Sequence, residues 1–419
     1  MSITRRRALI GGVSLAAAAA LALSACSSSK GSNTGGDSQS SAGGSTSAAA
    51  NAPKGSVIKI GNIASLSGSQ ASSSNQSATV APAWAEWVNA NGGIDGHPVQ
   101  IITVDDAGNP ATAQSVEKKL IDQDKVVAIL VGSDNVITAF DTDAISKGVP
   151  LISGGANSAD WYAKAGMYPT VTDVVSGQQL QLAVAQQYGH AKKFADLYCA
   201  EVASCAEATK LRKPYADKIG LGFTSLAVSS TATSYTAQCL QLQQQGVDYA
   251  QLNFSTAAAA KFIQDCQAQG FNPTWGSSEQ AIGDALLKVP NVTLFGPAYA
   301  FPSPLDSAAA QTFRDAMGKY AKDDNWKEGT ASFAWTGLEV LRAALQGIGP
   351  NAVTPKAVTD ALNTKIKNTD LNGLLANKIT FTAGKATPVG SHPCSFVVGI
   401  KDGKTVAPAG AQTVCANSS

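Results

Sequence analysis

Two short turns carry the side chains most able to bind a small polar molecule. Each turn follows an apolar run, at 126–131 and 149–153, and each is rich in Gly, Ser, Ala and Asn. Backbone N–H groups and polar side chains at such positions can hold an anionic or polar group where parallel strands end. The candidate residues are Ser133, Asp134, Asn135, Ser153, Gly155, Ala156 and Asn157. The same residue types are ordinary helix caps and turn formers, so the turns alone leave both interpretations open.

The turns belong to a chain that alternates strands and helices. Aliphatic runs without strict alternation are typical of parallel strands buried on both faces, and four occur at 57–60, 99–104, 126–131 and 149–153. After Pro110, Ala113, Val116 and Leu120 fall on one face of a helix. The pattern predicts an α/β fold whose parallel sheet is covered by helices on both faces.

A second series of strands and helices begins after Val171. Its predicted strands are 194–198, 225–228, 247–254 and 273–276. Beyond Pro297 we expect two helices, around Phe313 and around Leu341, and the runs 379–381 and 396–400 predict hairpins with turns at Gly384 and at Asp402-Gly403. A chain of 419 residues is too long for a single hydrophobic core, and we expect two domains.

The first 26 residues predict an export signal, because three arginines at 5–7 precede an apolar stretch that ends in small residues. The arginines also resemble a twin-arginine signal, so both the Sec and the Tat route stay open. The sequence Leu23-Ser24-Ala25-Cys26 resembles the lipobox of bacterial lipoproteins, which implies cleavage before Cys26 and a lipid anchor on that residue. Residues 27–55 are almost entirely small and polar, and predict a disordered tether.

Six cysteines remain once Cys26 is assigned to lipid. An even number in an exported chain predicts disulfides, although sequence cannot fix their connectivity. Proximity favours Cys199 with Cys205, Cys239 with Cys266, and Cys394 with Cys415. A zinc site is not expected, because the chain has no CxxC and its three histidines are far apart in sequence. We expect no metal and no other cofactor.

Composition and motifs exclude several classes of function. A net charge of +1 predicts no nucleic-acid partner. The chain has no GxSxG motif, and no histidine has an acidic neighbour arranged as a catalytic pair, so an exported hydrolase is only a remote alternative and we expect no enzyme.

Several segments together resemble the branched-chain amino acid family of ABC-transporter solute-binding proteins. They are IKIGNIASLSG, WVNANGGIDGHPVQIITVDDAGNPATAQSVEKKLI, VVAILVGSDN, VPLISGGAN, QQGVDYAQLNF and IKDGKTV, and the likeness extends over 56–408. The family has a type I periplasmic-binding-protein fold, with two Rossmann-like lobes joined by a three-crossover hinge. The resemblance implies a first lobe of 56–171 plus 298–376 and a second of 172–297 plus 377–419. All six paired cysteines then fall in the second lobe.

The resemblance also implies a ligand site. In members that bind amino acids, the first-lobe turns hold the α-carboxylate, and the seven turn residues named above match them. A second-lobe acidic residue receives the ammonium group, and Glu279 in GSSE is the matching position, unless it is only an exposed carboxylate at a helix start.

Three departures leave other ligands open. Asp134 stands where the family offers a hydroxyl, and an ionised aspartate would repel a carboxylate. The rim loop SQASSSNQS has no aromatic residue, and the turn at 201–205 has no tyrosine. A neutral, amide-like or cationic ligand with Asp134 as partner stays open, as does Asp134 acting only as a cap. Trp161 and Tyr162 are either stacking or core residues.

The function implied is capture of a small polar solute, an amino acid or a similar compound, between the lobes. A monomer anchored through Cys26 to the outer face of the cell membrane would deliver the solute to an ABC permease. The alternative is a ligand-sensing receptor subunit of the same fold for an amide, cationic or aromatic compound.

Overall fold

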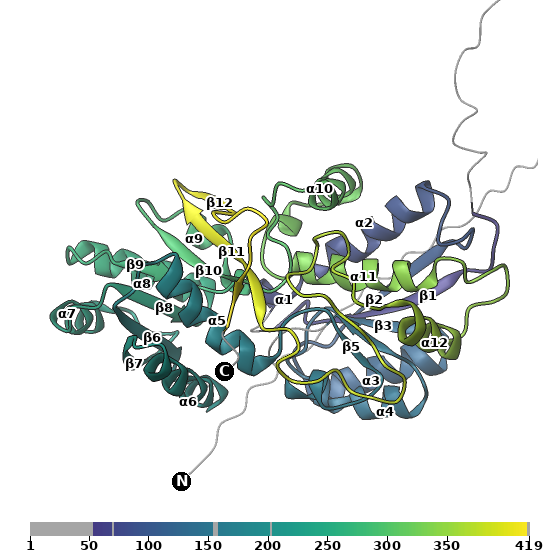
Figure 1. The fold of residues 1–419 in the computed structure, drawn as a ribbon, viewed down its shortest axis with the longest axis horizontal. Coiled ribbons are helices and arrows are strands. Elements are labelled where there is room, and N and C mark those ends of the chain that lie inside the picture. Colours follow the sequence, from purple (N-terminus) through teal and green to yellow (C-terminus); the bar gives the residue numbers. More distant parts are fainter. Residues whose placement is uncertain (1–52, 69–70, 154–157, 202, 417–419) are drawn as a thin grey trace, which may run out of the picture. The chain divides into compact units, whose positions relative to one another are not determined.

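The computed structural model describes residues 53–68, 71–153, 158–201 and 203–416, and these form two sheets with surrounding helices (Figure 1). The first sheet has five parallel strands in the order β2-β1-β3-β4-β5. Its strands are β1 (Ile58–Ala64), β2 (Val99–Asp105), β3 (Ala128–Val131), β4 (Leu151–Ser153) and β5 (Met167–Pro169). The α/β fold class predicted from the sequence is confirmed.

Helices cover both faces of the first sheet. They are α1 (Ala71–Ser74), α2 (Ser77–Ala90), α3 (Pro110–Asp122), α4 (Asp141–Ser146), α10 (Ala308–Tyr320), α11 (Ala331–Leu345) and α12 (Pro355–Lys365), with single turns η1 (Ile137–Ala139), η2 (Ala159–Tyr162) and η4 (Asn325–Lys327). In β3, Ala128 and Leu130 belong to the core that holds α2 and α11, whereas Ile129 and Val131 belong to the core that holds α3. Alternate residues of a strand point to opposite faces, so the unbroken apolar run is explained by burial on both sides.

The helix α3 begins where the sequence places it. The side chain of Asn109 accepts hydrogen bonds from Ala111 N at 2.9 Å and Thr112 N at 3.1 Å, and Pro110 occupies the first turn. Ala113 and Leu120 are fully buried against the sheet. The amphipathic pattern therefore identifies the face of α3 that packs on the first sheet.

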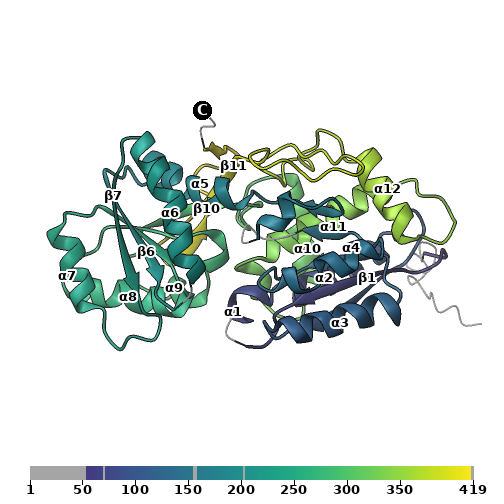
Figure 2. The same cartoon turned by 90° about the horizontal axis from the view of Figure 1, so that it is seen from below.

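The second sheet has eight strands, of which seven follow the order β12-β11-β10-β9-β8-β6-β7 while β13 pairs with β11. Its strands are β6 (Lys193–Cys199), β7 (Gly222–Val228), β8 (Tyr249–Asn253), β9 (Thr274–Gly276), β10 (Leu294–Ala298), β11 (Cys394–Lys401), β12 (Lys404–Val406) and β13 (Val414–Cys415). Strands β6 to β10 are parallel, and β11 is antiparallel to β10, β12 and β13. Around the sheet lie α5 (Val174–Gln187), α6 (Ala203–Lys218), α7 (Thr236–Gln244), α8 (Thr256–Ala268), α9 (Asp284–Leu287) and η3 (Glu279–Ala281) (Figure 2).

The chain passes between the sheets three times. It leaves β5 for α5, leaves β10 for α10, and leaves α12 for β11. The third passage includes residues 366–393, which contain no strand. The expected three crossovers are therefore present.

Two details of the predicted strands are wrong. No hairpin forms around Gly384, because Ile379 makes only an isolated bridge with Thr369 and Phe381 N donates to Ile366 O at 3.1 Å. Strands β5, β10 and β13 were not predicted, since β5 and β13 are only three and two residues long and β10 contains Gly296 and Pro297, residues that usually weaken a strand. The hairpin of β11 and β12 over the Asp402-Gly403 turn is confirmed.

The three disulfides join the pairs that proximity favours. Cys199 at the end of β6 is bonded to Cys205 in α6. Cys239 and Cys266 join α7 to α8, and Cys394 and Cys415 join β11 to β13. All six cysteines belong to elements of the second sheet and its helices.

The N-terminal predictions fall outside the described part of the chain. The signal, Cys26 and all but the last three residues of the tether lie within 1–52. Among the helices that the structure describes, none has the length and apolar character needed to cross a membrane.

Candidate functional site

Polar side chains gather where β1, β2 and β3 of the first sheet end. Ser65 follows β1, Asp106 follows β2, and Ser133 and Asn135 follow β3, and we call these four residues the edge network. Ser65 Oγ donates to Asp106 Oδ1 at 2.7 Å and lies 3.1 Å from Ser133 Oγ, and Asn135 Nδ2 donates to Ser133 Oγ at 2.9 Å. The carboxyl ends of parallel strands lie at one edge of a sheet, and Ser133 and Asn135 lie at this edge, as the sequence predicts.

The other predicted first-sheet residues have different surroundings. Asp134 is buried, and its backbone carbonyl accepts from Ile137 N at 3.4 Å at the start of η1. Ser153 has a positive φ of 92°, and its hydroxyl donates to Phe333 O of α11 at 2.9 Å. The Ser153 hydroxyl therefore holds α11 to the sheet. Gly155, Ala156 and Asn157 lie outside the described residues.

Glu279 lies at the start of η3, and only 6% of its surface is exposed. Ser332 Oγ of α11 donates to Glu279 Oε1 at 2.8 Å, while Oε2 finds no hydrogen-bond partner in the described chain. Burial raises the pKa of the Glu279 carboxyl to about 8, although the Ser332 hydroxyl and the backbone N–H groups of Ala300 and Tyr299 lower it. The exposed carboxylate considered from sequence is wrong, because Glu279 is buried.

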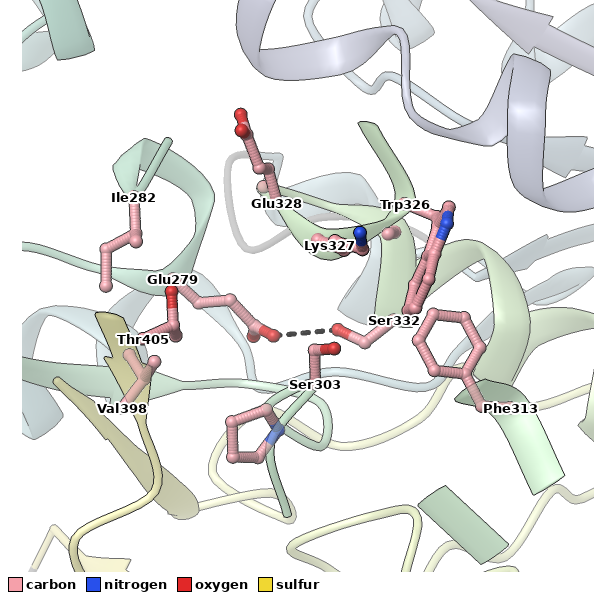
Figure 3. A pocket seen from close by; sticks show the side chains of 13 residues that line it. Glu279, Ile282, Ser303, Phe313, Trp326, Lys327, Glu328, Ser332, Val398 and Thr405 are labelled. Atoms are coloured by element: carbon pink, nitrogen blue, oxygen red, sulfur yellow. Dashed lines mark hydrogen bonds between the residues drawn. The ribbon is translucent and has the colours of Figure 1, made fainter. Parts of the chain in front are cut away.

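A small, open cleft lies beside Glu279 (Figure 3). Its walls combine apolar side chains with hydroxyls and charged groups, and the lining residues are Glu279, Ile282, Pro302, Ser303, Phe313, Trp326, Lys327, Glu328, Gly329, Ala331, Ser332, Val398 and Thr405. Elements of the second sheet, including η3, β11 and β12, supply one part of the wall, and α10, η4 and α11 supply the other. Such a mixed wall suits a small molecule with one polar end.

The aromatic residues of this cleft were not predicted as site residues. Phe313 and Trp326 meet edge to face, with ring centroids 5.5 Å apart, and Figure 3 shows them beside Ser332. Phe313 is fully buried and also packs on Trp335, and the sequence predicts only a helix around it. Trp326 stands in a charged loop without periodicity, so no sequence signal marked it.

The junction of α1 and α2 contacts both the edge network and the start of α11. Ser74 Oγ accepts from Asn135 Nδ2 at 3.4 Å, and Gln76 Oε1 accepts from Thr330 Oγ1 at 3.1 Å. Thr330 precedes the lining residues of α11 directly. Of the described residues predicted from sequence, Glu279 lines the cleft and Ser133, Asp134, Asn135 and Ser153 do not.

Trp161 and Tyr162 occupy core positions. Trp161 is fully buried with the residues beneath the first sheet. The Tyr162 hydroxyl donates to the backbone carbonyl of Val171 and lies 2.7 Å from Nδ1 of His392, which is also buried. Of the two roles considered from sequence, these contacts match the core role.

Comparison with known proteins gives one curated relative and many similar structures. An amino acid binding protein of Pseudomonas aeruginosa is 44% identical over 46 residues, which is 11% of this chain and 12% of that relative. The chain therefore matches only a small part of that protein's length. A family model described as periplasmic binding protein matches residues 57–404.

Three solved structures share the fold at low sequence identity. A branched-chain amino acid transporter substrate binding protein of Streptococcus pneumoniae, in complex with isoleucine, is 21% identical with a TM-score of 0.65 and covers 84% of this chain and 98% of its own. A branched chain amino acid ABC transporter protein of Thermus thermophilus with bound valine is 15% identical with a TM-score of 0.69, covering 85% and 96%. A fatty acid ABC transporter substrate-binding protein of Thermomonospora curvata is 18% identical with a TM-score of 0.66, covering 84% and 91%.

The family model spans most of the chain, and the two α/β sheets with three connections agree with it. The chain belongs to the periplasmic binding protein family.

Proposed function

We propose that this protein captures a small solute with an amino group, an amino acid or a similar compound, and delivers it to an ABC permease. The observation that carries the proposal is Glu279, a buried carboxyl on the wall of the cleft, one oxygen of which has no hydrogen-bond partner among the described residues. An unpartnered buried polar atom costs free energy, and a ligand donor would remove that cost. An ammonium group would add a charge-assisted hydrogen bond.

The lining of the cleft supports a solute that has an aliphatic part and an amino group. Ile282, Val398 and Trp326 would contact an aliphatic body while Glu279 receives the amino group. Two of the similar structures contain bound isoleucine and bound valine, which are compounds of this kind.

Capture between two lobes is the mechanism we propose, with the lobes at 56–171 plus 298–376 and at 172–297 plus 377–419. A ligand drives closure only if it binds the closed state better, which requires contacts on both sides. Glu279 follows β9 of the second sheet and Ser332 begins α11 on the first, so their 2.8 Å hydrogen bond joins the two parts. A solute amino group placed between them would contact both.

The same proposal includes export and lipid anchoring. Cleavage before Cys26 would leave a lipid-bound N-terminus and a tether of small polar residues from 27 to 55. A Cys26→Ser variant should move the protein from the membrane fraction to the soluble fraction. Retention of that variant on the membrane would contradict lipid anchoring through Cys26.

The decisive experiment measures the affinity of Glu279→Gln. Isothermal titration of the full chain with amino acids, amides, polyamines, sugars and aromatic acids first identifies the ligand. Glu279→Gln keeps the shape of the side chain and removes its charge, so an amine-bearing ligand should bind at least tenfold more weakly. Glu207→Gln, an exposed carboxylate on α6, is the matched control and should bind normally. Unchanged affinity in Glu279→Gln would refute the assignment.

A further inference from the structure

Glu279 is a buried carboxyl group with little to compensate a negative charge. Only 6% of the residue is exposed. Ser332 Oγ donates to its Oε1 at 2.8 Å, while Oε2 has no hydrogen-bond partner among the described residues (Figure 3). A carboxylate removed from water is unfavourable unless a cation or several donors compensate its charge. The protonation state of Glu279 therefore depends on the charged groups around it.

Asp196 shows how the same part of the protein binds a buried carboxylate when a cation is present. It lies on β6 and is fully buried, and Arg212 Nη1 lies 2.9 and 2.8 Å from its two oxygens. Thr209 Oγ1 and Asn253 Nδ2 also donate to it, at 2.7 and 2.8 Å. Among the described residues, Glu279 has no ion pair of this kind.

Lys327 is the one cation among the described residues that line the cleft. Its Nζ lies 2.9 Å from Asp324 Oδ1 and 5.3 Å from the centre of the Trp326 ring. The short segments within 53–416 that the structure does not describe contain no Lys, Arg or His, so they add no cation. The body of the chain therefore pairs no cation with Glu279.

Tyr299 and Glu328 are further titratable residues near Glu279. Burial raises the pKa of the Tyr299 phenol to about 12, so this group is neutral at physiological pH. Glu328 lines the cleft, and burial and the neighbouring Asp284 carboxyl raise its pKa. Neither residue adds positive charge. The pKa of about 8 for Glu279 agrees with these surroundings, because burial outweighs the lowering by the Ser332 hydroxyl and two backbone N–H groups.

We infer that Glu279 carries a proton in the solute-free protein and releases it to solvent when a solute ammonium group binds. Since Ser332 donates to Oε1, the acid proton is carried by Oε2, the oxygen without another partner in the described residues. On binding, the O–H bond breaks, the proton passes to water, and the carboxylate pairs with the ammonium group, which keeps its own protons. The inference rests on the proposed function and adds its regulation by pH.

The sign of the pH dependence follows from the two states of Glu279. Below the pKa of the solute-free carboxyl, each binding event releases one proton, so the association constant should rise about tenfold per pH unit. Above that pKa, Glu279 is ionised before the solute arrives, and this dependence ends. An α-amino group has a pKa of about 7.7 or more, so it is protonated between pH 5.5 and 6.5 and contributes no proton change there. Acidification should therefore favour release of the solute.

Calorimetric titration at pH 6 counts the released proton. The full chain is titrated with isoleucine, isoleucinamide and putrescine in phosphate, MES and Bis-Tris, buffers that differ in their ionisation enthalpy. For each compound that binds, the change of binding enthalpy with buffer should correspond to about one proton released, and the affinity should rise about tenfold from pH 5.5 to 6.5. Glu279→Gln should release no proton and lose this pH dependence. Glu207→Gln, an exposed carboxylate on α6, is the matched control and should behave as the wild type.

The outcomes separate the inference from the function on which it rests. Wild-type binding without proton release, together with weaker binding in Glu279→Gln, overturns the inference and leaves the proposed function standing. Proton release that persists in Glu279→Gln also overturns it, and its loss in Glu328→Gln would then identify Glu328 as the source. If none of the three compounds binds, both the inference and the amine-binding function fail.

Discussion

Replacing Glu279 should stabilise the protein while it weakens binding. In the unfolded chain a glutamate titrates near its ordinary pKa of 4.5, whereas burial raises the pKa of Glu279 to about 8 in the folded protein. The unfolded state therefore loses its proton at lower pH than the folded state does. The stability cost is absent below pH 4.5, grows as the pH rises, and reaches its maximum above the folded pKa.

The size of the effect follows from the two pKa values. Each pH unit between them costs up to about 1.4 kcal/mol, so the free energy of unfolding should fall by about 3 kcal/mol between pH 5 and pH 8 through this residue. A neutral glutamine in the same position has no such dependence. Glu279→Gln should thus be close to the wild type in stability at pH 5 and more stable at pH 8.

Urea unfolding of both proteins at pH 5, 6, 7 and 8, without ligand, measures this difference. Glu207→Gln again serves as the control, because its carboxylate is exposed in the folded protein. Stability curves of Glu279→Gln and the wild type that stay parallel over this pH range would show that Glu279 is hydrated, and the reasoning about its burial would be wrong.

Three further changes test the packing around the site. Tyr162→Phe removes the hydroxyl that contacts His392 and should lower the free energy of unfolding, measured in urea, by about 1 kcal/mol. Because burial lowers the pKa of His392, the wild type should lose stability as the pH falls below 6.5. A His392→Gln variant should lose less stability over that range. Arg212→Met removes the cationic partner that lies 2.8 Å from the buried carboxylate of Asp196 and should cost about 3–5 kcal/mol, while a loss under 1 kcal/mol would contradict the buried pair. Gly132→Ala would place a Cβ 2.0 Å from a side-chain oxygen of α2, so circular dichroism should show a lower melting temperature, and an unchanged value would refute the close approach.

Gly318→Ala is a useful control for the last change. Among the described residues, no atom lies within 4 Å of an added Cβ on Gly318, which is in the last turn of α10. Alanine has the higher helix propensity, so this variant should gain up to about 1 kcal/mol. Together the two glycines distinguish close packing from a general sensitivity to substitution.

Local sequence patterns were sufficient where one segment determines its own structure. The aliphatic run before Gly132 predicts β3, because a strand with no polar face must be covered on both sides. Asn109 followed by Pro110 predicts the start of α3, because both side chains act within one turn. The disulfides followed from proximity, since short separations in an alternating strand and helix pattern keep the partners on neighbouring elements.

Local sequence patterns did not predict the structure where contacts between distant segments determine it. Strand β10 contains Gly296 because a Cβ there would lie 1.5 Å from Ser277 O, a requirement visible only when β9 and β10 are paired. The Ser153 hydroxyl was expected at a ligand, but its acceptor is Phe333 O, 180 residues further along the chain. Trp326 lines the cleft, although no pattern in the sequence around it indicated a site residue.

The sequence alone determined the fold class, the positions of most strands along the chain, the even number of cysteines available for disulfides and the polar character of the strand ends. These depend on periodicity, composition and short-range spacing, which are properties of single segments. Only the tertiary structure decided that Glu279 is buried beside Ser332, and that the Ser65 hydroxyl donates to Asp106. Burial and the direction of a hydrogen bond depend on which distant atoms approach a group, so no local pattern can contain them.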